Sequence, residues 1–232
     1  MEIKQFRYGD TNLAYLIYSG GEAAAIDGGA PEEILDFIKT QNLRLKYVLN
    51  THEHHDHTPG NERLLKINSV EFIAPAGLVK MKQFHLGDES VEVFATPGHT
   101  EDSIVFKHSG WLITGDTLFN GTVGNCYSGD YETYFNSLEK VLSFPPGTKI
   151  FAGHDIVDYS LGVAKKIDPE NQFLSLYRSK YDKNLVVSTL EMELKVNPFI
   201  RFNDSKLDAY RSGLKMSLDT PYLRWRAMMS VH

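Results

Sequence analysis

The sequence of 232 residues contains a single cysteine, Cys126, so no disulfide bond can form within the chain. No second thiol or CxxC motif accompanies Cys126, and we expect a partly buried, inert side chain in a reducing compartment. Long apolar runs are missing too: none approaches the ~20 residues of a membrane span, and the first residues lack the order of a secretory signal. These absences predict a cytoplasmic protein without a membrane partner.

Positive charge is also limited. The chain has 24 Lys and Arg against 30 Asp and Glu, which gives a formal net charge of -6, and the basic residues are scattered rather than clustered. This balance disfavours nucleic acid as a partner. Hydrophobic residues make up 42% of the chain, which is ample for a buried core, and the length fits one large domain or one domain with a smaller appendage.

The first 155 residues or so alternate short β-rich segments with helical ones, which is typical of an α/β fold. Strands are expected at 13–19, 22–29, 46–51, 71–75, 89–100, 103–116 and 149–155, and helices at 31–42 and 131–144. Asp130 should cap the second of these helices. Further helices are expected at 169–184 and 188–196, the latter with a Ser188/Glu191 capping box. We therefore predict an α/β domain over residues 1–158 and a smaller helical region over 159–232.

Residues 51–61 read THEHHDHTPGN and contain the spacing HxHxDH on the loop that follows the expected strand 46–51. Imidazole nitrogen and carboxylate oxygen are ligands that borderline divalent ions prefer, and the lack of thiolates excludes a zinc knuckle. The pattern predicts a catalytic metal site on a loop, where functional residues concentrate. His55 and Glu53 lie between the candidate ligands and are expected to support them or to lie on the surface.

Three more candidate ligands end expected strands: His99 in TPGHT, Asp116 in TGDTLF and His154 in AGHD. Over residues 15–155 this arrangement resembles the metallo-β-lactamase superfamily, which implies an αββα sandwich, here with a C-terminal helical region. The resemblance implies two divalent ions, zinc first, with iron or manganese as alternatives. The implied ligands are His52, His54 and His99 for the first ion, Asp56, His57 and His154 for the second, and Asp116 as the bridge.

The resemblance also implies roles for several other residues. Asp56 and Asp116 are the expected catalytic residues, with Asp56 accepting a hydrogen bond from the nucleophile. Asp27, in AIDGG, either orients a ligand from behind or serves as a turn residue before two glycines. The three histidines that lie outside any motif are expected to be structural; they are His85, His108 and His232.

Within the superfamily, THEHHDHTPGN, TPGHT, TGDTLF and AGHD resemble the glyoxalase II branch, the hydroxyacylglutathione hydrolases. VNPFIRF, at 196–202, is similar to an NPFLR element in that family's helical region, which covers the active site. The resemblance implies hydrolysis of a small-molecule hydroxyacyl thioester. A thiol has a pKa of ~8.5, so the thiolate departs with little help from a general acid.

The residues expected to contact the thiol carrier depart from the family pattern. Tyr127 is retained, whereas Asn125 replaces a basic residue and Ile156 replaces a tyrosine. Arg211 and Lys215 loosely match a basic pair in the family's last helix, where a spacing of four residues would place them on one face; the alternative is a solvated amphipathic surface. We infer substrate contacts at these five positions, and either a carrier with fewer negative charges than glutathione or a different thiol, such as trypanothione or a small thiol. The segment after Thr220 has no recognised counterpart.

Three alternatives remain open. A persulfide dioxygenase resembles the HxHxDH and TPGHT segments but uses one iron, and it lacks the NPFIR element. A lactonase or phosphodiesterase would use the same nucleophile on another bond. A diiron redox protein of this fold usually has glutamate at the second histidine of the motif, where this chain has His54.

Overall fold

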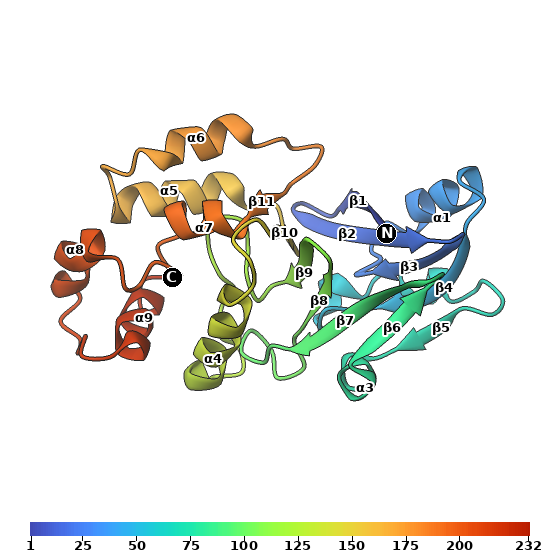
Figure 1. Ribbon diagram of the computed structural model, residues 1–232, viewed down its shortest axis with the longest axis horizontal. Coiled ribbons are helices and arrows are strands. Elements are labelled where there is room, and N and C mark those ends of the chain that lie inside the picture. Colours follow the sequence, from blue (N-terminus) through green and yellow to red (C-terminus); the bar gives the residue numbers. More distant parts are fainter.

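Two β-sheets form the centre of the computed structural model, which describes residues 1–232 (Figure 1). The first sheet has the order β1 (Glu2–Tyr8), β2 (Asn12–Ser19), β3 (Glu22–Ile26), β4 (Arg44–Leu49) and β5 (Glu71–Ile73). The second has the order β11 (Ser188–Thr189), β10 (Lys149–Ala152), β9 (Trp111–Gly115), β8 (Ile104–His108), β7 (Glu89–Ala95) and β6 (Gln83–Leu86). Both sheets are mixed, because the β3–β4, β4–β5 and β9–β10 pairs are parallel and the other pairs antiparallel.

Alternating side chains divide the apolar residues of the sheets between an inner and an outer layer. In β2, Leu13, Tyr15 and Ile17 join the core between the two sheets. Ala14 and Leu16 point the other way, as the two-residue period of a strand requires. They pack with Ile34 and Ile38 of α1 (Pro31–Thr40) and Leu64 of α2 (Asn61–Leu64). One helical layer therefore covers the outer face of the first sheet.

The outer face of the second sheet is covered by α4 (Tyr131–Leu142), with α9 (Pro221–Met229) packed on it. The Asp130 carboxylate caps α4 by accepting a hydrogen bond from the Thr133 backbone N–H at 2.9 Å, as predicted. Trp225 of α9 is fully buried against the rings of Tyr134 and Phe135. The layers are thus helix, sheet, sheet and helix, which confirms the predicted αββα sandwich.

The helices that follow β10 gather at one end of the sandwich (Figure 1). They are α5 (Val157–Ile167), α6 (Phe173–Lys180), α7 (Leu190–Val196), α8 (Asp208–Gly213) and α9. The predicted domain border at residue 158 falls in the first turn of α5. Leu174, Tyr177 and Val186, beyond that border, belong to the same apolar cluster as the inner faces of the sheets. The division into two domains stays a prediction, and the two parts share a core.

One local expectation was wrong, and one strand was not predicted. Thr189, rather than Ser188, caps α7 by accepting a hydrogen bond from the Met192 backbone N–H at 3.3 Å. Ser188 and Thr189 instead pair with β10 as the edge strand β11. Strand β1 was missed because only Gln5 among its residues is buried, so the sequence shows no apolar alternation there. The short helix α3 (Pro75–Met81) completes the fold, and no helix has both the length and the apolarity that crossing a membrane would need.

Candidate metal centre

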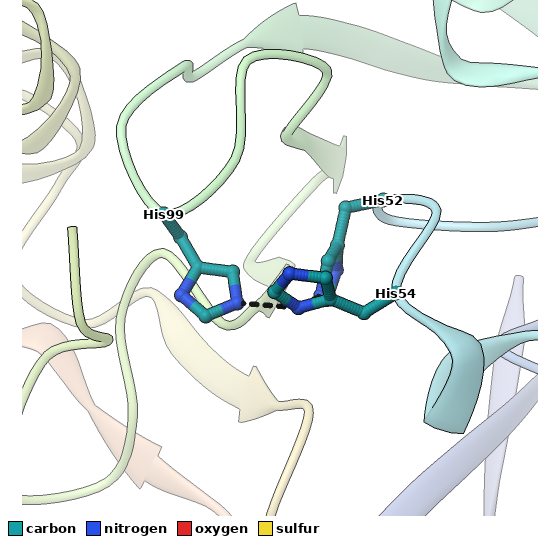
Figure 2. A group of neighbouring side chains, drawn as sticks. All are labelled: His52, His54 and His99. Atoms are coloured by element: carbon teal, nitrogen blue, oxygen red, sulfur yellow. Dashed lines mark hydrogen bonds between the residues drawn. The ribbon is translucent and has the colours of Figure 1, made fainter. Parts of the chain in front are cut away.

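The predicted ligands meet at one edge of the sandwich, where strands of both sheets end. The loop after β4 provides four of them and includes the 3-10 turn His55–His57. The other three follow β7, β9 and β10 of the second sheet. In chain order the seven residues are His52, His54, Asp56, His57, His99, Asp116 and His154. Figure 2 shows His52 and His54 from the first loop facing His99 from the loop that follows β7.

The first group of nitrogen atoms belongs to His52, His54 and His99. The His52 Nε2 lies 3.0 Å from the His54 Nδ1, and the His99 Nε2 lies 3.1 Å from that same atom. These distances bring three imidazole nitrogens around one point, with all ligand atoms within 4.8 Å of one another. Burial lowers the pKa of His99 and, together with the nearby His57, lowers that of His52 to about 4. Both rings are therefore neutral at pH 7, which is the form that binds metal.

The second group consists of Asp56, His57 and His154. The His154 Nε2 lies 3.2 Å from the His57 Nε2 and 3.3 Å from the Asp56 Oδ2. Asp116 lies between the two groups: its Oδ1 is 3.4 Å from the His57 Nε2, and its Oδ2 is 3.4 Å from the Nε2 atoms of His99 and His154. The carboxylate of Asp116 is thus placed to contact ligands of both sites at once.

Several observations fit this donor set to a pair of cations. The Asp116 Oδ1 is buried and accepts no hydrogen bond. A Cβ at Gly153 would lie 2.2 Å from that oxygen, and a Cβ at Gly124 would lie 2.8 Å from the His99 Nδ1. Only glycine lets the backbone approach the ligands this closely. Nitrogen and oxygen donors without thiolate suit borderline divalent ions.

The negative charge around His57 points the same way. Burial alone would lower the pKa of His57, but the carboxylates of Asp27 and Asp116 outweigh burial and raise this pKa to about 11. The pKa of Asp116 stays well below its usual range despite burial, because the imidazoles of His154 and His57 lie close to its carboxylate, each with Nε2 3.4 Å from one of its oxygens, and favour the ionised form. A cation bound here would interact favourably with the same negative charge.

Asp27 is fully buried and connects several residues behind the centre. Its Oδ2 lies 3.1 Å from the His57 Nδ1 and accepts a hydrogen bond from the Thr51 hydroxyl at 2.7 Å. Its Oδ1 accepts a hydrogen bond from the Thr51 backbone N–H at 2.8 Å. This geometry favours the first interpretation of Asp27, because a carboxylate on Nδ1 orients the His57 ring so that Nε2 faces the centre.

Three other histidines are held in the same manner by partners that the sequence did not reveal. The His52 Nδ1 lies 3.0 Å from the Thr51 hydroxyl oxygen, the His99 Nδ1 lies 2.9 Å from the Asn125 carbonyl oxygen, and the His154 Nδ1 lies 3.0 Å from the Thr11 hydroxyl oxygen. Asn12 donates a hydrogen bond from Nδ2 to the Asp56 Oδ2 at 2.9 Å. Thr11 and Asn12 lie at the turn into β2, with no motif to mark them.

A pocket of about 570 Å³ opens above the centre. Its floor consists of His54, Asp56, His99, Asp116 and His154, and its wall consists of Phe119, Thr122, Val123, Asn125, Tyr127, Ile156, Tyr159 and His232. Three of the five expected substrate contacts line it: Asn125, Tyr127 and Ile156. No lysine or arginine does.

Arg211 and Lys215 lie away from this pocket, which corrects two expectations. Helix α8 ends at Gly213, so the two residues do not share a helix face. Arg211 is only 2% exposed, and its guanidinium donates hydrogen bonds to the Phe202 carbonyl oxygen and to the carboxylate of Asp208. It is therefore neither a solvated surface residue nor part of the pocket wall, and the predicted substrate contact of this pair loses its basis.

The remaining histidines and the cysteine differ in their exposure and contacts. His55 and His85 are exposed, and the His108 Nδ1 lies 2.8 Å from the Ser90 carbonyl oxygen at the edge of the second sheet. Cys126 is partly buried, as expected. His232 differs from the prediction, because its ring lines the pocket and contacts Thr122 and Asn125.

Comparisons with known proteins agree with this geometry. The family model of the metallo-beta-lactamase superfamily matches residues 7–83 and 82–154. A hydroxyacylglutathione hydrolase of Vibrio cholerae is 32% identical, with 87% of this chain and 86% of that protein covered. One of Pelagibacter ubique is also 32% identical, with 87% of this chain and 93% of that protein covered. The crystal structure of ETHE1 from Myxococcus xanthus superimposes with a TM-score of 0.68 at 21% identity, covering 100% of this chain and 99% of that one, which shows a shared fold.

Proposed function

Because the chain belongs to the metallo-beta-lactamase superfamily and, within it, to the family of the hydroxyacylglutathione hydrolases, we propose that it is a binuclear metal-dependent thioester hydrolase. The reaction would convert a hydroxyacyl thioester and water into a hydroxy acid and a thiol. The observation that carries the proposal is the place of Asp116, whose two carboxylate oxygens reach histidines of both ligand groups at 3.4 Å.

The division of the ligands between two ions stays a proposal, supported by the two groups of donor atoms described above. We propose that His52, His54 and His99 would hold the first ion, that Asp56, His57 and His154 would hold the second, and that Asp116 lies close enough to both groups to serve both. We propose zinc, with iron or manganese as alternatives that accept the same ligands. When bound, the two ions supply positive charge that polarises the substrate carbonyl and lowers the pKa of water toward neutrality.

Asp56 is the residue proposed to orient the attacking water. Burial raises the pKa of Asp56, but the hydrogen bond from Asn12 and the nearby His57 and His154 lower it overall. The carboxylate is therefore ionised at neutral pH and accepts a hydrogen bond from the water. About half of the Asp56 side chain is exposed, which leaves it open toward the pocket.

Tyr127 bounds the pocket beside the first ligand group. Its ring centroid lies 5.4 Å from that of His54 and 5.3 Å from that of His99, with the rings edge to face. We propose that this ring shields the reacting carbonyl from bulk water on that side. The leaving thiolate needs little protonation, so the absence of lysine and arginine from the wall is compatible with a thioester.

Metal analysis of the purified protein, combined with a thioester panel, tests the proposal. We expect two divalent ions per chain and hydrolysis of hydroxyacyl esters of glutathione, coenzyme A or a small thiol, with the free thiol detected by a disulfide reagent. Homoserine lactones and bis-p-nitrophenyl phosphate serve as controls for the other hydrolase types. Faster turnover of either control than of every thioester would refute the proposal, as would a single iron with consumption of oxygen.

A further inference from the structure

The wall of the pocket carries no positive charge to match an anionic carrier. Its lining includes the neutral Asn125, Ile156, Tyr127 and Tyr159, of which Tyr127 and Tyr159 are 66% and 63% exposed. A carboxylate on the thiol arm of a substrate would find no ion-pair partner on this wall. Aromatic and aliphatic side chains instead suit a neutral, partly apolar arm, with hydrogen bonds needed only for its polar groups.

His232 fixes the polar part of this wall. Its Nδ1 lies 3.0 Å from the Asn125 Oδ1 and its Nε2 lies 3.1 Å from the Thr122 hydroxyl oxygen, so both ring nitrogens have partners. The ring also packs edge to face on Phe199 at 4.7 Å between centroids. In the tautomer that satisfies both contacts, Nδ1–H donates to Asn125 and Nε2 accepts from Thr122.

This contact decides which end of the Asn125 amide faces the substrate. Because Oδ1 is taken by His232, the Nδ2 amide is directed to the other side, where it donates to the Tyr127 hydroxyl oxygen at 3.4 Å. The second N–H of that amide and the Tyr127 hydroxyl hydrogen remain as donors at the wall. The backbone carbonyl of Asn125, which holds His99, is independent of this side-chain relay.

We propose that Asn125, Tyr127 and His232 form the subsite for the thiol arm and select a neutral carrier that contains an amide and no carboxylate. Asn125 and Tyr127 donate hydrogen bonds to the amide carbonyl of the carrier, and His232 is a positioning residue that acts through Asn125. Ile156 and Tyr159 contact the aliphatic segment next to the sulfur. The inference rests on the proposed thioester hydrolysis and adds the chemical class of the carrier.

Three lactoyl thioesters separate the features of the carrier. The N-acetylcysteamine ester is neutral and contains an amide, the 2-mercaptoethanol ester is neutral without an amide, and the glutathione ester carries carboxylates. For the metal-loaded enzyme we expect kcat/KM to be about tenfold higher on the first than on each of the others, which corresponds to about one or two hydrogen bonds. An equal or higher value on the glutathione ester would overturn the inference and leave thioester hydrolysis standing.

Variants of His232 test the relay itself. His232→Ala should raise KM for the N-acetylcysteamine ester about tenfold with kcat changed less than about threefold. His232→Gln, whose amide can still donate to Asn125, should recover most of the loss. His85→Ala, at an exposed histidine outside the pocket, is the matched control and should leave both constants unchanged. A KM that does not respond to His232→Ala would overturn the role of this residue.

A binding measurement keeps the inference testable apart from catalysis. S-methyl-N-acetylcysteamine cannot be hydrolysed, and its Kd is measured by ligand-observed NMR against each variant, with thermal unfolding as the check on folding. We expect an approximately tenfold weaker Kd for His232→Ala and a near-normal Kd for His232→Gln. If no thioester is hydrolysed, the proposed function fails while this titration still decides whether the subsite binds a neutral amide. An unchanged Kd in His232→Ala would refute the subsite.

Discussion

The floor and the wall of the same pocket are built in different ways. The floor lies at the ends of strands from two packed sheets. At the floor and directly behind it, the imidazoles of His52, His57, His99 and His154 each have their Nδ1 atom held by a neighbour. The wall comes from the loop between β9 and α4, from α5 and from the residues after α9, and it includes the exposed rings of Tyr127 and Tyr159. The groups proposed for chemistry lie shortly after strands and have buried partners, whereas those proposed for recognition come from a longer loop, a helix and the residues after α9.

Removing Asp116 should have the largest effect, since this side chain contacts both ligand groups of the floor. We expect Asp116→Ala to lower kcat/KM on the best thioester by about 10³-fold or more and to reduce the metal content below two ions per chain. Metal analysis and steady-state kinetics on the same sample measure both. Asp88→Ala, at an exposed turn, is the control. Retention of both activity and full metal content would contradict the proposed role of Asp116 in both ligand groups.

A change behind the floor should have an intermediate effect. Asp27→Asn keeps the size of the side chain and tolerates the left-handed backbone at this position, where φ is 52°. The substitution removes the negative charge of the carboxylate that lies beside the His57 Nδ1. We therefore expect metal affinity to fall about 10–100-fold. Competition with a chromophoric chelator gives the affinity, and Asp36→Asn on the exposed side of α1 is the control. An unchanged metal affinity would mean that Asp27 serves only as a turn residue and does not orient His57.

A variant of Arg211 tests whether this side chain in the helical region makes a charged contact with the carrier or only stabilises the fold. Arg211→Ala removes a buried guanidinium that donates hydrogen bonds to the Phe202 carbonyl oxygen and to the Asp208 carboxylate. We expect it to lower the free energy of unfolding by about 2–3 kcal/mol. KM should change less than about twofold, because Arg211 does not line the pocket. Urea unfolding and kinetics measure the two effects. A selective rise in KM for the glutathione ester would reinstate this residue as a carrier contact.

The smallest effect is expected far from both floor and wall, at Glu22 in β3. Hydrogen bonds from Lys46 and from the Gly87 backbone N–H lower the pKa of Glu22 to about 2. Since the folded pKa is below the unfolded value, this stabilisation is present above about pH 4.5 and disappears as the pH falls toward 2. The group is partly exposed, so Glu22→Gln should cost about 0.5 kcal/mol at pH 7.

Urea unfolding of the wild type and of Glu22→Gln at pH 7, 5 and 3 tests this expectation. The difference between them should shrink as the pH is lowered; Glu33→Gln in α1, measured at the same pH values, is the control. A difference that grows toward acid pH would contradict the sign of the shift.

The floor could be predicted from sequence because its signals are local. Each proposed ligand directly follows or lies shortly after a strand, and HxHxDH combines four of them within six residues. Their supporting partners were harder to find, because Thr11 and His154 meet only when β2 lies beside the end of β10. Asp27 was the one partner with a local signal, and two interpretations fitted it equally until its hydrogen bonds were known.

The wall was predicted less well because its contacts depend on the tertiary structure. His232 lies beside Asn125 only because α9 packs on α4, and nothing in its neighbouring residues indicates that contact. Arg211 and Lys215 were placed on one helix face from their spacing, but the helix ends between them. A spacing of four residues places two side chains on one face only if both residues belong to the same helix. The burial of Arg211 depends on tertiary packing, which the spacing does not predict.

The division of the ligands between two sheets has a consequence for the newly made chain. The HxHxDH loop leaves the ribosome early, but His154 follows roughly a hundred residues later, about 5–20 s at ordinary rates of synthesis. Until then the first loop offers an incomplete set of donors. Ion capture therefore belongs to a late stage of maturation, after β10 has emerged and docked, and a nascent chain stalled before that strand should retain metal only weakly.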